Sequence, residues 1–162
     1  MRKAKATPSF DHYLHALSKN DEALLTVLKG HLVVEALLVE LIQLRVNSDT
    51  MWRGNFPTKT SKCVEFGFIT QDQAEALNDL NDLRNDFAHV LGQDITFDRV
   101  FSLAQKAALA EFDFSDDTLH QDRATAEEWY GIDGGLLEIL NSFYFDLALI
   151  LHNNGGPNRM GG

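Results

Sequence analysis

The sequence holds a single cysteine, Cys63, among its 162 residues. One cysteine cannot form a disulfide within the chain or a thiolate metal site, and this usage fits a reducing compartment. We therefore expect Cys63 to pack in the core. The sequence also lacks a glycine-rich phosphate loop, a zinc-ligand spacing and a Ser/His/Asp arrangement, so it predicts none of the sites that these patterns build.

Positive charge is scarce, with 14 Lys and Arg against 24 Asp and Glu and a net charge of −10. Phosphate backbones are bound mainly through Lys and Arg, so this balance is unfavourable for tight, sequence-independent binding of nucleic acid. The charge is uneven, however, because residues 1–62 carry nine Lys or Arg and six Asp or Glu. That half can supply a local positive cleft through Arg45, Arg53, Lys59 and Lys62.

Long apolar runs are also missing, since Glu35 and Glu40 interrupt the longest candidate for a membrane span. The amino terminus is charged as far as Pro8, with no apolar core of signal-peptide length behind it. We expect a cytoplasmic protein without a membrane partner. The length and the hydrophobic content of 44% predict one domain over residues 1–152, followed by a disordered tail over residues 153–162.

No alternating strand pattern appears, whereas apolar residues recur at helical spacing throughout, which predicts an all-α bundle of about five or six helices. We expect a short helix over 10–17, a long central helix from Asn20 and Asp21 to about Val46, and a short one over 58–68. Thr70 and Gln73 form a capping-box pattern that starts the next helix. Thr96 or Asp94 caps another, which reaches about 112. A solvated connection over 111–133, in which Ala124 to Trp129 can form a helical turn, leads to a last helix after Gly134 and Gly135.

The segment Leu83–His89 carries the most informative pattern, with Arg84 and His89 five positions apart at the end of an apolar stripe. Five steps of about 100° leave the two side chains roughly 140° apart on an ideal helix. One copy of the chain therefore cannot present both on a single face without a local break or a second subunit. The stripe that faces the core consists of Ala76, Leu80, Leu83, Phe87 and Val90.

The motif Arg84-Asn85-Asp86-Phe87-Ala88-His89 resembles the R-x4-6-H signature of the HEPN superfamily, in which a polar residue often follows the arginine, as Asn85 does here. The resemblance implies a helical bundle that forms a two-fold homodimer, with two copies of the motif over a cleft. Many members are metal-independent RNases. A mannitol-repressor-like or another uncharacterised branch of the superfamily also fits this layout.

By that resemblance, Arg84, His89 and Asn85 are the catalytic residues of an endoribonuclease of toxin or defence type that needs no metal or cofactor. His89 handles the proton of an attacking 2′-hydroxyl, Arg84 stabilises charge on the phosphate, and Asn85 orients His89 or donates to the phosphate. Family toxins paired with a nucleotidyltransferase antitoxin often carry a tyrosine two residues beyond the histidine. Leu91 stands there, so control by modification at that position is not expected.

Other readings stay open beside this one. Arg84 can instead pair with Asp79 or Asp82, and His89 can cap helix carbonyls, in which case the domain is a non-catalytic interaction or transcription-regulatory module with a protein partner. His31 and Glu35 lie one helical turn apart, a spacing that can hold a metal, although hydrogen bonding is the commoner role. The same applies to Asp11, His12 and His15. Trp52, Phe56 and Phe66 can stack bases or line a groove, although a place in the core or in a dimer interface is the commoner role.

Overall fold

The computed structural model describes residues 21–47, 53–89 and 94–161, with the backbone alone for His89. Six helices and no strand occur in these ranges, which confirms the all-α prediction. In chain order the helices are α2 (Glu22–Gln43), α3 (Phe56–Glu65), α4 (Gln71–His89), α5 (Phe97–Leu109), α6 (Thr118–Gln121) and α7 (Arg123–Asn153). The predicted helix over 10–17 lies outside the described residues.

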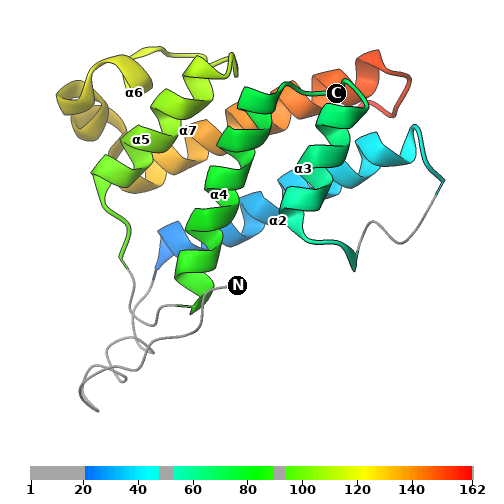
Figure 1. The fold of residues 1–162 in the computed structure, drawn as a ribbon. Coiled ribbons are helices and arrows are strands. Elements are labelled where there is room, and N and C mark those ends of the chain that lie inside the picture. Colours follow the sequence, from blue (N-terminus) through cyan, green and yellow to red (C-terminus); the bar gives the residue numbers. More distant parts are fainter. Residues whose placement is uncertain (1–20, 48–52, 90–93, 162) are drawn as a thin grey trace.

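The long helices α2 and α7 pack along each other and form the centre of the bundle (Figure 1). On its other side α2 contacts α3 and α4, while α5 and α6 pack against α7. The helix α4 also contacts α3 and α5, so it links the two flanks of the molecule. The helix α2 is consequently shared between two different helix interfaces.

Side-chain caps fix where the helices begin. Asp21 accepts a hydrogen bond from the amide of Leu24 at 3.1 Å, and Thr96 accepts one from the amide of Arg99 at 3.2 Å. Thr70 and Gln73 form both bonds of a capping box, at 2.9 and 3.1 Å. Each cap satisfies an amide that has no partner within its helix. The predicted starts of α2, α4 and α5 are therefore confirmed.

The apolar stripe predicted for α4 faces the core. Ala76, Leu80 and Leu83 are buried, and Phe87 packs against the same core from a partly buried position. Val90 lies outside the described residues. Cys63 is buried as expected, with its thiol 3.7 Å from the carbonyl oxygen of Leu38. Burial raises the pKa of the Cys63 thiol to about 12.

The buried face of α2 does not include all of the apolar residues of this helix. Leu32 is 65% exposed, and the stripe on the core side passes instead through Val27, His31, Val34 and Leu38. The apolar residues of this helix cover much of its circumference, so the pattern alone does not select the buried face. The consequence is that an imidazole, rather than a leucine, lies at the centre of the buried face.

The last helix begins earlier than predicted. It starts at Arg123, capped by the Asp122 side chain, and runs through Gly134 and Gly135 without ending there. The break in the helix lies at Gly131, whose φ of 62° is a conformation that glycine adopts without strain. Gly135 serves close packing, since a Cβ there would lie 2.9 Å from the side chain of Val100 on α5. The predicted solvated connection is thus largely helical.

By length and composition, α7 is apolar enough to cross a membrane, which the search of the sequence for apolar runs did not predict. Half of an apolar stretch of 18 consecutive residues in this helix is buried inside the fold. The helix packs against α2, α5 and α6, and the buried side chains include Leu136, Phe143 and Leu147. These contacts are those of the core helix of a bundle.

The segment that follows α7 differs from the predicted disordered tail. The helix continues to Asn153, and the amide of Gly156 donates to the carbonyl of Leu151 at 2.9 Å. Arg159 then pairs with Glu40 on α2 at 2.6 Å. The glycine and asparagine content of this segment favoured disorder, but the ion pair between Arg159 and Glu40 holds the described part of the tail against α2.

Candidate functional site

A polar groove of about 420 Å³ opens where α2, α4 and the start of α3 meet. We call it the Arg84 groove. Its walls come from three separate parts of the chain, so the tertiary fold alone brings them together. The residues that line it are His31, Glu35, Gly54, Asn55, Phe56, Pro57, Asn81, Arg84 and Asn85.

Arg84 is the cation of this groove. Its guanidinium donates to the Oδ1 atom of Asn85 at 3.2 Å and pairs with no carboxylate of the described residues. Asp79, one of the partners expected from the sequence, is instead held by two bonds of 2.9 Å from Arg99. A partly buried guanidinium of this kind retains donors that match the oxygens of a phosphate.

His31 lies on the α2 wall of the same groove and is buried. Its Nε2 atom lies 2.9 Å from Oδ1 of Asn81, and its ring packs 4.6 Å from the ring of Phe56. Burial is the main cause that lowers the pKa of His31 below its usual 6.5, against an opposing effect of the Asn81 hydrogen bond. The imidazole is therefore mainly neutral at pH 7.

Glu35 follows His31 by one turn of α2 and also lines the groove. Behind it, the Nζ atom of Lys59 lies 3.2 Å from the Glu35 carboxylate, and the Lys59 side chain is 0% exposed. This contact brings the two charges together, but no hydrogen bond of good geometry reaches Nζ. A buried ammonium with unused donors is costly, so the Glu35 carboxylate is what makes its burial tolerable.

Of the three predicted site residues, Arg84 and Asn85 both line the groove. The predicted third member, His89, ends α4, and its side chain lies outside the described residues. The helix α4 is continuous from position 84 to position 89, without the local break that would bring both positions onto one face. Helical geometry therefore keeps the two positions roughly 140° apart within one chain.

Two of the four cations expected to form a positive cleft contact residues outside the groove, and Arg53 is exposed and does not line it. Lys62 pairs with Glu65 at 3.0 Å, and Arg45 stacks 4.9 Å from the ring of Phe68. Of the four, Lys59 contacts a residue of the groove. Among the predicted aromatics, Phe56 is in the groove, Phe66 packs near Phe68, and Trp52 lies outside the described residues.

The sequence pattern does not predict that His31 and Arg84 lie in the same groove. For His31 and Glu35 it left metal binding and hydrogen bonding open: His31 does make a hydrogen bond between helices, to Asn81, and no third side chain of ligand type joins the pair within the described part of the chain. The available signal was a histidine at helical spacing from Val27 and Val34 of α2. Its partner across the groove is 53 residues away in sequence, a pairing that periodicity along one helix does not reveal.

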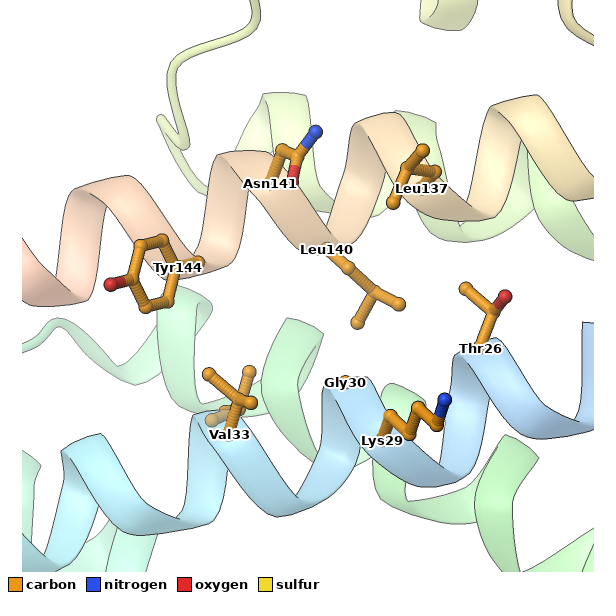
Figure 2. A pocket seen from close by; sticks show the side chains of 9 residues that line it. Thr26, Lys29, Gly30, Val33, Leu137, Leu140, Asn141 and Tyr144 are labelled. Carbon is orange, nitrogen blue, oxygen red and sulfur yellow. The ribbon is translucent and has the colours of Figure 1, made fainter. Parts of the chain in front are cut away.

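A second hollow of about 360 Å³ lies between α2 and α7, and we call it the α2–α7 groove. Figure 2 shows Leu137, Leu140 and Tyr144 of α7 above Val33 and Lys29 of α2. The helices approach closely at Gly30, where a Cβ would meet the side chain of Leu140 at 2.4 Å. This hollow is more apolar than the Arg84 groove, whose walls carry His31, Glu35 and Arg84.

Comparison with known proteins gives no assignment, because no family model, curated protein or solved structure matches the chain.

Proposed function

We propose that this protein is a metal-independent endoribonuclease of toxin or defence type, and that the Arg84 groove binds the scissile phosphate of RNA. The observation that carries the proposal is a guanidinium that pairs with no carboxylate of the described residues, in a groove that also holds a neutral imidazole. The HEPN-like motif over Arg84–His89 supports the same function. The start of α3 lines the groove too, and the partial positive charge of a helix amino terminus favours an anion there.

In this proposal Arg84 binds the non-bridging oxygens of the phosphate and stabilises the charge that develops as the 2′-hydroxyl attacks. Asn85 holds the guanidinium through the 3.2 Å hydrogen bond. Because α4 is continuous, His89 of the same chain does not share a helix face with Arg84. The His89 imidazole is supplied by a second copy of the chain in a homodimer, and the enzyme acts in the cytoplasm.

The test is incubation of purified protein with mixed RNA in a chelator, beside the variant His89→Ala. We expect cleavage by the wild-type protein and strongly reduced cleavage by the variant. Arg123→Ala is a suitable control, since Arg123 forms surface pairs with Asp98 and Glu127 away from the groove. Cleavage that depends on added metal would contradict the mechanism. Light scattering tests the dimer, and a strictly monomeric protein would contradict the two-copy cleft.

A non-catalytic interaction or transcription-regulatory module is the second candidate. The net charge of −10 and the solvent-exposed apolar side chains beside α2 and α7 favour it, among them Leu32 and Leu137. Its partner would be an antitoxin or a regulatory protein. Wild-type protein that is folded, does not cleave RNA and has no effect on growth when overexpressed would favour this candidate over the enzyme.

A further inference from the structure

We propose that His31 is a catalytic residue of the Arg84 groove and takes the proton from the attacking 2′-hydroxyl. This inference rests on the proposed endoribonuclease function and adds a residue that the motif does not contain. With this role for His31, one chain supplies both the residue that binds the phosphate, Arg84, and the base. The two residues face each other across the interface of α2 and α4.

Geometry favours His31 over His89 as the imidazole partner of Arg84 within one chain. His31 and Arg84 line the same cavity from two different helices. They are also close enough for the charge of Arg84 to lower the pKa of His31. Positions 84 and 89, in contrast, are separated around a continuous helix. A substrate phosphate bound to Arg84 would thus lie beside the ring of His31.

The contacts of His31 prepare it to accept a proton. With Oδ1 of Asn81 as acceptor, the hydrogen of the neutral ring lies on Nε2, and Nδ1 keeps its lone pair. The described residues give Nδ1 no hydrogen-bond partner. The ring of Phe56 packs against the imidazole and fixes its plane. A base must be unprotonated near neutral pH, and burial keeps this ring so.

Three charged groups shift the pKa of His31, and their combined effect decides whether the ring can act as a base. Glu35 raises the pKa of His31, whereas Arg84 and Lys59 lower it. The buried Lys59 is paired with Glu35 at 3.2 Å and so offsets the effect of the carboxylate on the ring. We assign Lys59 as a positioning residue, which acts on His31 by its own charge and through Glu35, without contact with the substrate.

The proposed step balances without a metal or an oxidant. Nδ1 of His31 takes the proton of the 2′-hydroxyl, the O2′ atom forms a bond to phosphorus, and the bond from phosphorus to O5′ breaks. The departing O5′ takes a proton from the His89 imidazolium of the second copy or from water. The products are a 2′,3′-cyclic phosphate and a 5′-hydroxyl.

The first experiment compares His31→Gln with His152→Gln, since His152 is an exposed histidine at the end of α7. In a chelator, we expect His31→Gln to lower kcat by about 10²-fold or more with little change in KM. The acid limb of the pH profile of kcat/KM, which Glu35, Arg84 and Lys59 also influence, should disappear. Lys59→Met should shift that limb, a change that a purely structural role would not produce.

The outcomes separate this inference from the proposed function. A wild-type protein that cleaves no RNA overturns the proposed function. A wild-type protein that cleaves RNA, with unchanged kcat and pH profile in a folded His31→Gln variant, overturns the role of His31 alone. Circular dichroism and thermal unfolding establish that the variant is folded, and loss of folding in His31→Gln is answered by the second experiment.

The second experiment needs no variant at position 31. The ring signals of His31 are followed by NMR while uridine 3′-monophosphate is added to the wild-type protein and to Arg84→Ala. We expect a saturable shift of the His31 signals in the wild-type protein and none in Arg84→Ala. Unmoved His31 signals during saturable binding to the wild-type protein would overturn the proposal.

Mixing of inactive variants tests the single-chain arrangement. Arg84→Ala mixed with His89→Ala should recover about a quarter of the wild-type activity, because half of the dimers are mixed and each has one intact composite site. Arg84→Ala mixed with His31→Gln should recover none, since each groove lacks one residue. Recovery in the second mixture would overturn the assignment of both residues to one groove.

Discussion

The two grooves beside α2 differ in the chemistry of their walls. The Arg84 groove holds a guanidinium, a carboxylate and an imidazole, and its walls include three asparagines. The α2–α7 groove has a mainly apolar surface, to which Val33, Leu137 and Leu140 contribute, and its helices approach closely at Gly30 (Figure 2). His31 and Gly30 are neighbours in sequence. One helix therefore separates proposed chemistry on one side from packing on the other, and substitutions on its two sides should affect different properties.

The largest effect on function should come from Arg84→Ala. Removal of the guanidinium should reduce RNA cleavage by about 10²–10³-fold, the loss typical of one group that stabilises transition-state charge. Arg84→Lys should restore little, because a lysine lacks the planar fork of donors. The free energy of unfolding should change by less than about 1 kcal/mol, since the guanidinium pairs with no described carboxylate. Single-turnover cleavage and urea unfolding measure the two quantities, and a large loss of stability would contradict this assignment.

The next effect concerns the buried ion pair behind the same groove. Lys59→Met removes the cation and leaves Glu35 partly buried without it, so we expect a loss of about 3 kcal/mol in unfolding free energy. The double variant Lys59→Met with Glu35→Leu should recover most of that loss, because no lone charge remains. Urea unfolding of the two single variants and the double variant gives the coupling free energy between Lys59 and Glu35. Strictly additive losses would show that the two charges do not interact.

A smaller effect is expected on the apolar side of α2. Gly30→Ala places a Cβ within 3 Å of the Leu140 side chain, so the gain in helix propensity should be outweighed by a net loss of about 1–2 kcal/mol. Gly134→Ala is the matched control on α7, where the nearest atom is an ordinary 3.5 Å away. That variant should gain about 0.5–1 kcal/mol. Thermal unfolding compares them, and equal shifts would contradict the close approach at Gly30.

The smallest effect is the pH dependence of stability through His31. Its pKa is lowered in the folded protein from about 6.5, so the unfolded chain binds the proton first as the pH falls. The folded state should lose stability from about pH 6.5 downward, until the lowered pKa is passed. His31→Gln should flatten this part of the curve between pH 7.5 and pH 5.5, whereas His152→Gln should not. Urea unfolding at several pH values measures the slope, and an unchanged slope in His31→Gln would contradict the burial of a neutral ring.

Much of the fold could be predicted from interactions between residues close in sequence. The side chains of Asp21, Thr70 and Thr96 each accept a hydrogen bond from the amide three residues further on, and the sequence shows these capping residue types directly. The start of α7 was missed because acidic residues around Asp122 resembled a solvated loop, although Asp122 is itself a cap. The role of Gly135 depends on contact with Val100 of another helix, which no local pattern records.

The candidate site could be predicted only in part, because some of its contacts join residues that are far apart in sequence. Arg84 and Asn85 are adjacent, and a short motif predicted that they act together. His31 joins them through the crossing of α2 and α4, and the apolar residues of α2 cover too much of the helix for the sequence to select its buried face. The depth of Lys59 could not be predicted either, because lysine is rarely buried without a partner and that partner, Glu35, is on another helix.

The single thiol of the chain offers a built-in reporter for the stability measurements. Cys63 is buried, and its pKa of about 12 leaves almost no thiolate at neutral pH, so alkylating reagents should reach it only when the bundle opens. The modification rate at low reagent concentration then reports the population of opened molecules. Because no other cysteine competes, every variant at either groove can be compared by mass spectrometry without an added label.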